Sequence, residues 1–230
     1  MSYISYHWLR NGSVVFEDKA MKPFTCSVCA FVALSFTILL AAPEPAVVQE
    51  PGLWTLDVTF EHPQQILLRR SNGTERFWYV IISATNTTDR DIDFYPKCEL
   101  MTDTFRILPA VAGASPALIE QIKTRHKTKY PFLQSLDQAG NKILQGRDNT
   151  KDIAVIWPDF DPNAKALKCF ISGLSNETAV VEHPVLKNDD GTPVSVYLRK
   201  TLELSYALSG DPAFRSEQKL DYEQKRWVMR

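Results

Sequence analysis

The sequence predicts a mainly β domain, a sandwich of two antiparallel sheets with one helix inserted near the middle. About eight short apolar runs, alternating or continuous, are separated by turn-forming residues, which is typical of a sandwich. Only one segment combines a helix start, an apolar stripe and a helix stop. The chain has 230 residues, of which 44% are hydrophobic and 11% aromatic, so it can form a folded core.

The strands are predicted from apolar periodicity and from the turns between them. In chain order they cover residues 53–61, 65–70, 76–86, 92–101, 153–157, 167–174, 178–182 and 194–208, and residues 92–101 are expected to form one or two strands broken at Pro96. The pair Asn72-Gly73 favours a tight hairpin turn. Residues 76–86 are almost continuously apolar, as expected of a central strand covered on both faces. Residues 194–208 place apolar side chains on one face, and only Lys200 interrupts the series.

The helix is expected to begin at Pro116, a residue that suits the first helical position, with Ser115 as its cap. Pro131 is expected to end it. Its apolar stripe consists of Leu118, Ile119 and Ile122. The helix and its flanks, about 109–135, form an insertion between the two halves of the sandwich. Two separate small β domains are the alternative, but residues 53–108 alone would make a thin core.

Residues 24–42 form a long uncharged apolar run that follows Lys19 and Lys22. The pattern predicts either a cleaved secretory signal peptide or a retained membrane anchor helix. The small residue Ala42 suits cleavage, whereas Pro43 directly after it does not, so both alternatives stay open. In both cases the basic flank stays in the cytoplasm and the rest of the chain crosses the membrane.

The chain therefore divides into four predicted segments. Met21 is where an exported chain would be expected to start, so residues 1–20 are interpreted as a mis-called extension. Residues 21–42 are the signal peptide or anchor, and residues 43–52 are a proline-rich linker. The β-sandwich domain with its helical insertion occupies residues 53–230.

Two cysteines follow the apolar run, Cys98 and Cys169. In an oxidising compartment they can form a disulfide that contributes about 4 kcal/mol by closing a long loop. The alternative is two buried free thiols in strands. Cys26 and Cys29 have a C-x-x-C spacing, but they lie inside the apolar run, which does not fit a redox or metal site.

The net charge of −1 gives no general attraction to nucleic acid. The densest basic cluster lies on the predicted helix and just after it, and it consists of Lys123, Arg125, Lys127 and Lys129. A solvated helix face is the simpler interpretation. The functional interpretation is a patch that binds an anionic partner.

No catalytic motif, cofactor motif or metal-binding spacing is found. Asp159 and Asp161 have the spacing of a calcium loop, but Ala164 stands where a glycine is needed, so an EF-hand is excluded. The simpler interpretation is a turn in which both aspartates cap backbone amides. We therefore expect no cofactor, no metal and no catalytic residues.

Several stretches resemble uncharacterised exported proteins of planctomycete-type bacteria that contain immunoglobulin-like domains. They are residues 76–86, 91–103, 156–162, 171–176 and the closing Arg226–Arg230. The resemblance spans most of residues 53–230 and implies an immunoglobulin-like sandwich and export from a bacterium. It implies no activity, because none of these stretches is a catalytic motif.

The functional expectation is an exported, non-catalytic interaction or structural module of the bacterial cell envelope, periplasmic or extracellular, with an unidentified partner. It would touch a membrane only through residues 24–42, if these are not cleaved. One alternative is an envelope hydrolase with an unrecognised site, which would need a cleft with His126 or His183 and two carboxylates. Another is a membrane-tethered protein whose C-terminal domain lies outside the cytoplasm.

Overall fold

The structure, a computed structural model, describes residues 42–46 and 51–230, and Ala42–Arg230 forms one compact unit. The predicted extension at 1–20 and all but the last residue of the predicted signal or anchor lie outside the described residues. The strands are β1 (Asp57–Phe60), β2 (Gln64–Arg70), β3 (Gly73–Thr85), β4 (Ile92–Asp93), β5 (Lys97–Thr102), β6 (Ile107–Pro109), β7 (Gln134–Ser135), β8 (Lys142–Ile143), β9 (Lys151–Pro158), β10 (Ala166–Ser172), β11 (Thr178–Lys187), β12 (Pro193–Ser209) and β13 (Lys219–Met229). The helices are α1 (Pro116–His126) and three short 3₁₀ turns at Leu136–Gln138, Arg147–Asn149 and Pro212–Glu217.

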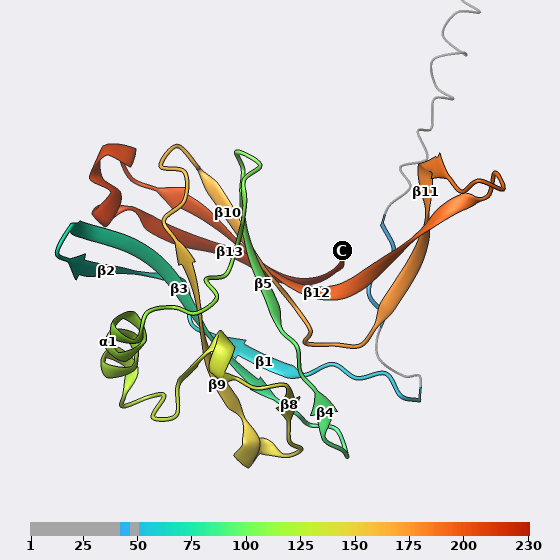
Figure 1. Cartoon of the computed structure of the whole chain (residues 1–230), viewed down its shortest axis with the longest axis horizontal. Coiled ribbons are helices and arrows are strands. Elements are labelled where there is room, and N and C mark those ends of the chain that lie inside the picture. The colour runs from blue at the N-terminus through green and yellow to red at the C-terminus, as the bar shows by residue number, and fades with distance from the viewer. Residues whose placement is uncertain (1–41, 47–50) are drawn as a thin grey trace, which may run out of the picture. The chain divides into compact units, whose positions relative to one another are not determined.

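The first sheet contains β1, β2, β3, β7 and β9, with β3 at its centre (Figure 1). β9 pairs with one edge of β3, while β2 and β1 pair with the two halves of the other edge. The predicted hairpin between β2 and β3 is confirmed, because Arg70 pairs with Gly73 across a two-residue turn. Gly73 adopts a φ of 139°, a conformation that L side chains rarely adopt.

The second sheet runs in the order β11, β12, β10, β5, β6, with β13 added on the other edge of β12. The long strand β12 pairs first with β11 and then with both β10 and β13. β13 was not predicted from the sequence. Most of its side chains are exposed, so it shows no apolar alternation.

Two hydrophobic cores bury the two faces of β3. The main core lies between the sheets, where Val80 and Ile82 of β3 pack with Leu202 and Leu204 of β12. The second core lies on the opposite face of the first sheet, where Ile81 packs with α1. Because β3 is covered on both faces, its sequence is continuously apolar, as predicted. A mainly β architecture with two large sheets around a shared core is therefore confirmed, and β4 and β8 form a third, two-stranded sheet.

Helix α1 begins at the predicted residue but differs from the prediction in its capping bond and in where it ends. Pro116 stands in its first turn and its three predicted apolar residues are buried. However, Ser115 makes no side-chain capping bond, and its buried hydroxyl has no partner. The helix ends at His126, before Pro131, because residues 127–131 turn back and Tyr130 N donates to His126 O at 2.9 Å.

Candidate functional site

The predicted basic cluster is largely occupied by contacts within the protein. Arg125 Nη1 donates to Gln65 O at 3.0 Å and lies 3.3 Å from the Tyr79 hydroxyl, which fixes α1 to the first sheet. Lys129 forms an ion pair with Glu61. Lys123 pairs with Glu120 at 3.3 Å, and only Lys127 makes no side-chain ion pair or hydrogen bond within the described part of the chain. These contacts reduce the positive charge that remains available to a partner.

The two histidines that an envelope hydrolase could use, His126 and His183, lie in different surroundings. His126 Nε2 lies 2.8 Å from the Tyr79 hydroxyl, and burial together with Arg125 lowers the pKa of His126. The nearby carboxylate of Glu61 acts in the opposite direction and raises the pKa of His126. His183 is on β11, where Nδ1 accepts from the backbone amides of Val185 and Leu186. Among residues 42–46 and 51–230, no three His, Cys, Asp or Glu side chains form a group able to hold a metal.

Cys98 and Cys169 are free, buried thiols on the neighbouring strands β5 and β10. Cys98 pairs with Ile171, and Cys169 pairs with Leu100, so the two cysteines are diagonal neighbours. Diagonal positions are about 7–8 Å apart, beyond the Cα separation that a disulfide usually spans. Burial raises the pKa of both thiols, that of Cys169 to about 12. The disulfide stays a prediction, and its formation would require the strands to shift.

Asp159 and Asp161 adopt the predicted turn. Asp159 Oδ1 accepts from Phe160 N at 3.1 Å, and Asp161 Oδ1 accepts from Asn163 N at 2.9 Å. Asp159 also binds the Arg215 guanidinium at 2.9 Å and accepts from the indole of Trp78. The aspartates therefore stabilise a turn and hold the 212–217 segment against it.

The most distinctive polar feature is a buried ion pair that the sequence analysis did not assign. Lys200 Nζ lies 2.7 Å from Glu177 Oε2, and the two side chains are only 7% and 9% exposed. Lys200 is the residue that interrupts the apolar series of β12. It lies on the same face of β12 as Leu202 and Leu204, the inner face of the second sheet.

Glu177 is positioned by the loop between β10 and β11. Glu177 N donates to Ser175 Oγ at 3.1 Å, and Ser175 Oγ donates to Trp54 O at 2.8 Å. Thr55 Oγ1 adds a bond to Ser175 Oγ at 2.9 Å. These bonds join the loop to the segment that precedes β1. The backbone of Glu177 is therefore held in place through Ser175 by a part of the chain far away in sequence.

The ion pair binds the backbone of residues 42–46, the start of the predicted linker. Ala46 N donates to Glu177 Oε1 at 2.8 Å, and Lys200 Nζ donates to Ala46 O at 3.3 Å. Both backbone polar groups of one residue are thus bonded to a single pair of charged side chains. The predicted spacer forms no regular element, but its first part is docked on the domain.

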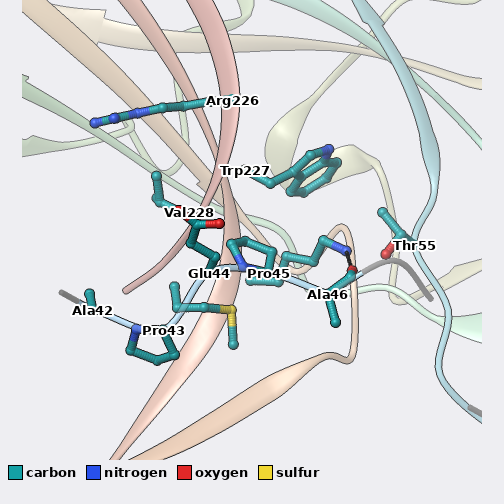
Figure 2. Close-up of a pocket in the computed structure, with 11 residues that line it drawn as sticks. Ala42, Pro43, Glu44, Pro45, Ala46, Thr55, Arg226, Trp227 and Val228 are labelled. Atoms are coloured by element: carbon teal, nitrogen blue, oxygen red, sulfur yellow. Dashed lines mark hydrogen bonds between the residues drawn. The ribbon is translucent and has the colours of Figure 1, made fainter. Parts of the chain in front are cut away.

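A pocket of about 790 Å³ lies between this segment and the end of β13. Its apolar walls come from Pro43, Pro45, Trp227 and Met229. Trp227 projects toward the side where Pro45 and Ala46 lie, whereas Arg226 points the opposite way (Figure 2). Lys200 Nζ also lies 5.6 Å from the centre of the Trp227 ring, within the range of a cation–π contact.

Comparisons of the chain with protein-family models, with curated proteins and with solved structures found no match. Within the described residues, the structure contains no helix of the length and apolarity needed to cross a membrane.

Proposed function

We propose that the chain is an exported, non-catalytic interaction module of the bacterial cell envelope, built on an immunoglobulin-like sandwich. Its groove beside Lys200 and Glu177 would be the binding surface, and residues 24–42 would be the signal peptide or anchor helix. The apolar run with its basic flank supports export. The facing antiparallel sheets support the sandwich.

The bonds to Ala46 support a groove that recognises an extended peptide. They involve only the backbone N–H and C=O, so the pair recognises a chain direction rather than a particular side chain. The prolines at 43 and 45 favour an extended conformation, so the segment loses little entropy when it docks. Trp227 adds an aromatic wall, which is common in grooves that bind proline-rich segments.

The groove is occupied in the structure by the protein's own segment. A tethered segment has a high effective concentration, so a partner peptide must compete with residues 42–46. A partner with a longer apolar segment could also fill the space beside Trp227 that residues 42–46 leave open. The groove would therefore bind an extended, proline-containing peptide of a partner by displacing the linker.

A peptide-binding experiment tests this proposal. The probe is a fluorescent peptide with the sequence of residues 42–52, added to the full chain and followed by anisotropy. In Ala46→Pro the amide that bonds Glu177 is absent, so we expect the linker to dissociate and the probe to bind more tightly than to the wild type. Ala46→Gly keeps the amide and the carbonyl, and it serves as the matched control.

The Ala46→Pro chain with Glu177→Leu and Lys200→Met should lose the probe while staying folded by circular dichroism. Removing both charges together avoids leaving one of them buried and unpaired. If folded Ala46→Pro does not bind the probe, or the triple variant binds it equally well, the groove is not a peptide site.

Export and partner binding require separate measurements. Fractionation of producing cells, with the mass of the purified protein, reports location, processing after Ala42 and any Cys98–Cys169 bond. Recovery of the intact chain from the cytoplasm would overturn the export proposal.

The basic cluster of Lys123, Arg125, Lys127 and Lys129 remains a proposed anionic-partner patch. Reversing the charges of Lys123, Arg125 and Lys127 should release a partner that uses it.

A further inference from the structure

A second pocket lies on the outer face of the second sheet, the face turned away from the main core. Its volume is about 310 Å³. It is lined by Lys97 and Glu99 of β5, Phe170 and Ser172 of β10, Arg199 and Thr201 of β12, and Arg230. Three of these seven side chains are cations and one is a carboxylate. The side chains that line the pocket therefore carry an excess of positive charge in a chain whose net charge is −1.

The single carboxylate leaves much of this positive charge available. Glu99 accepts from Lys97 at 3.1 Å and from Arg230 at 2.7 Å. The bond from Lys97, followed by that from Arg230, keeps the pKa of Glu99 below its ordinary value, so it stays ionised at neutral pH. Arg199 makes no side-chain hydrogen bond or ion pair among the described residues. Its guanidinium is an uncommitted donor at the edge of the pocket.

Two arginines stand directly opposite each other in this pocket. Arg199 N donates to Arg230 O at 2.8 Å, and Arg230 N donates to Arg199 O at 3.1 Å. This mutual pairing places their side chains on the same face of the sheet, and like charges at such positions repel each other. The repulsion is unfavourable in the free protein, and an anion bound between the two guanidinium groups would remove it.

Arg230 is held in place before any ligand binds. Its guanidinium carbon lies 4.2 Å from the centre of the Phe170 ring, and Phe170 is only 6% exposed. The contacts with the aromatic ring and with Glu99 restrain the guanidinium, so less side-chain entropy remains to be lost on binding.

From these observations we infer that the outer-face pocket binds a tetrahedral oxyanion of the phosphate type. Lys97 lies on β5, Arg199 lies on β12 and Arg230 directly follows β13, so the pocket takes its cationic donors from three separate strands of the sheet. A tetrahedral oxyanion offers oxygens in several directions, whereas a planar carboxylate offers two oxygens in one plane. This site is independent of the proposed peptide groove. Thr201 and Arg199 lie on the outer face, while Lys200 between them lies on the inner face.

The test uses the full-length protein and inorganic phosphate as the probe. Binding is followed by calorimetry at low ionic strength, with sodium chloride of equal ionic strength as the reference. Arg199→Gln is the test variant because this side chain makes no internal contact, and Arg147→Gln is the control with the same change in charge at another exposed arginine. We expect phosphate affinity to fall about tenfold or more in Arg199→Gln and to stay unchanged in Arg147→Gln.

Thermal unfolding provides a second readout that separates binding from damage. Without phosphate, Arg199→Gln should unfold at the same temperature as the wild type or a higher one, because the arginine repulsion is gone. With phosphate, only the wild type and Arg147→Gln should gain stability. The inference is overturned if phosphate does not bind the wild type, if Arg199→Gln binds it equally well, or if Arg147→Gln weakens binding as much.

Discussion

The two faces of β12 carry charged groups in contrasting surroundings. Lys200 faces inward and is buried with Glu177 beneath the docked residues 42–46. Glu203, three residues along, faces outward and is itself 3% exposed. Its partners Arg226 and Lys168 are 49% and 38% exposed. Both members of the first ion pair are therefore buried, while the second network ends in side chains that reach water.

This difference has energetic consequences. When a buried charge loses its partner, no water can take the partner's place. The unpaired charge is therefore strongly destabilising. A charge whose partners are partly hydrated loses less stabilising free energy when one partner is removed, because water can replace it. The enclosed pair should therefore be sensitive to single substitutions, and the open network should tolerate them.

The largest effect is expected for Glu177→Ala. It removes the carboxylate and leaves Lys200 buried without a counter-charge, so we expect a loss of about 3–5 kcal/mol in the free energy of unfolding. Urea denaturation measures it. The double variant Glu177→Leu with Lys200→Met should lose much less, because neither charge remains. A double variant as unstable as the single one would show that the pair is not the cause.

The second prediction compares two glycines with the same backbone conformation. Gly173 and Gly191 both have a φ of +82°. At Gly173 a Cβ would collide with the backbone carbonyl of Tyr95 and lie 2.9 Å from Pro96 Cα, whereas at Gly191 no atom lies within 4 Å. Gly173→Ala should therefore destabilise by about 1–3 kcal/mol more than Gly191→Ala. Equal losses would show that only the backbone conformation matters.

The strands whose side chains are buried in a core could be predicted from the sequence alone. Residues 76–86 indicated a strand buried on both faces, and the structure places the second core under Ile81 and the main core over Ile82. This works because apolar burial leaves a periodic pattern in the sequence. β13 leaves no such pattern because it pairs along an edge and most of its side chains are exposed to water.

The candidate site was harder to predict, because it depends on contacts across long sequence distances. Ala46 and Glu177 are 131 positions apart. The one local signal was Lys200, a charge within an apolar series, and such a charge requires a partner when it is buried. That signal could have identified the position as important. It could not have identified Glu177, whose place depends on the β10–β11 loop.

The third prediction concerns pH and the open network. Burial alone would raise the pKa of Glu203, but the bonds from Arg226, Lys168 and Ser205 prevail and hold it below its ordinary value. The unfolded chain therefore binds the proton more readily, and the stabilisation is lost as the pH falls through the folded-state pKa. Glu203→Gln should be less stable than the wild type by about 1–2 kcal/mol at neutral pH. Denaturation curves should show this gap closing below about pH 4, and a gap that is constant with pH would contradict the assignment.

The smallest effect is expected for Arg226→Gln. Its guanidinium makes two bonds to Glu203, at 2.9 and 3.0 Å, but the side chain is half exposed and Lys168 remains 3.0 Å from the same carboxylate. Water and Lys168 can therefore replace most of what Arg226 provides, and we expect a loss below about 1 kcal/mol in urea denaturation. Lys168→Gln should behave similarly, and the two substitutions together should cost more than their sum, because each cation substitutes for the other. A loss from Arg226→Gln alone as large as that from Glu177→Ala would mean that enclosure does not distinguish the two faces of β12.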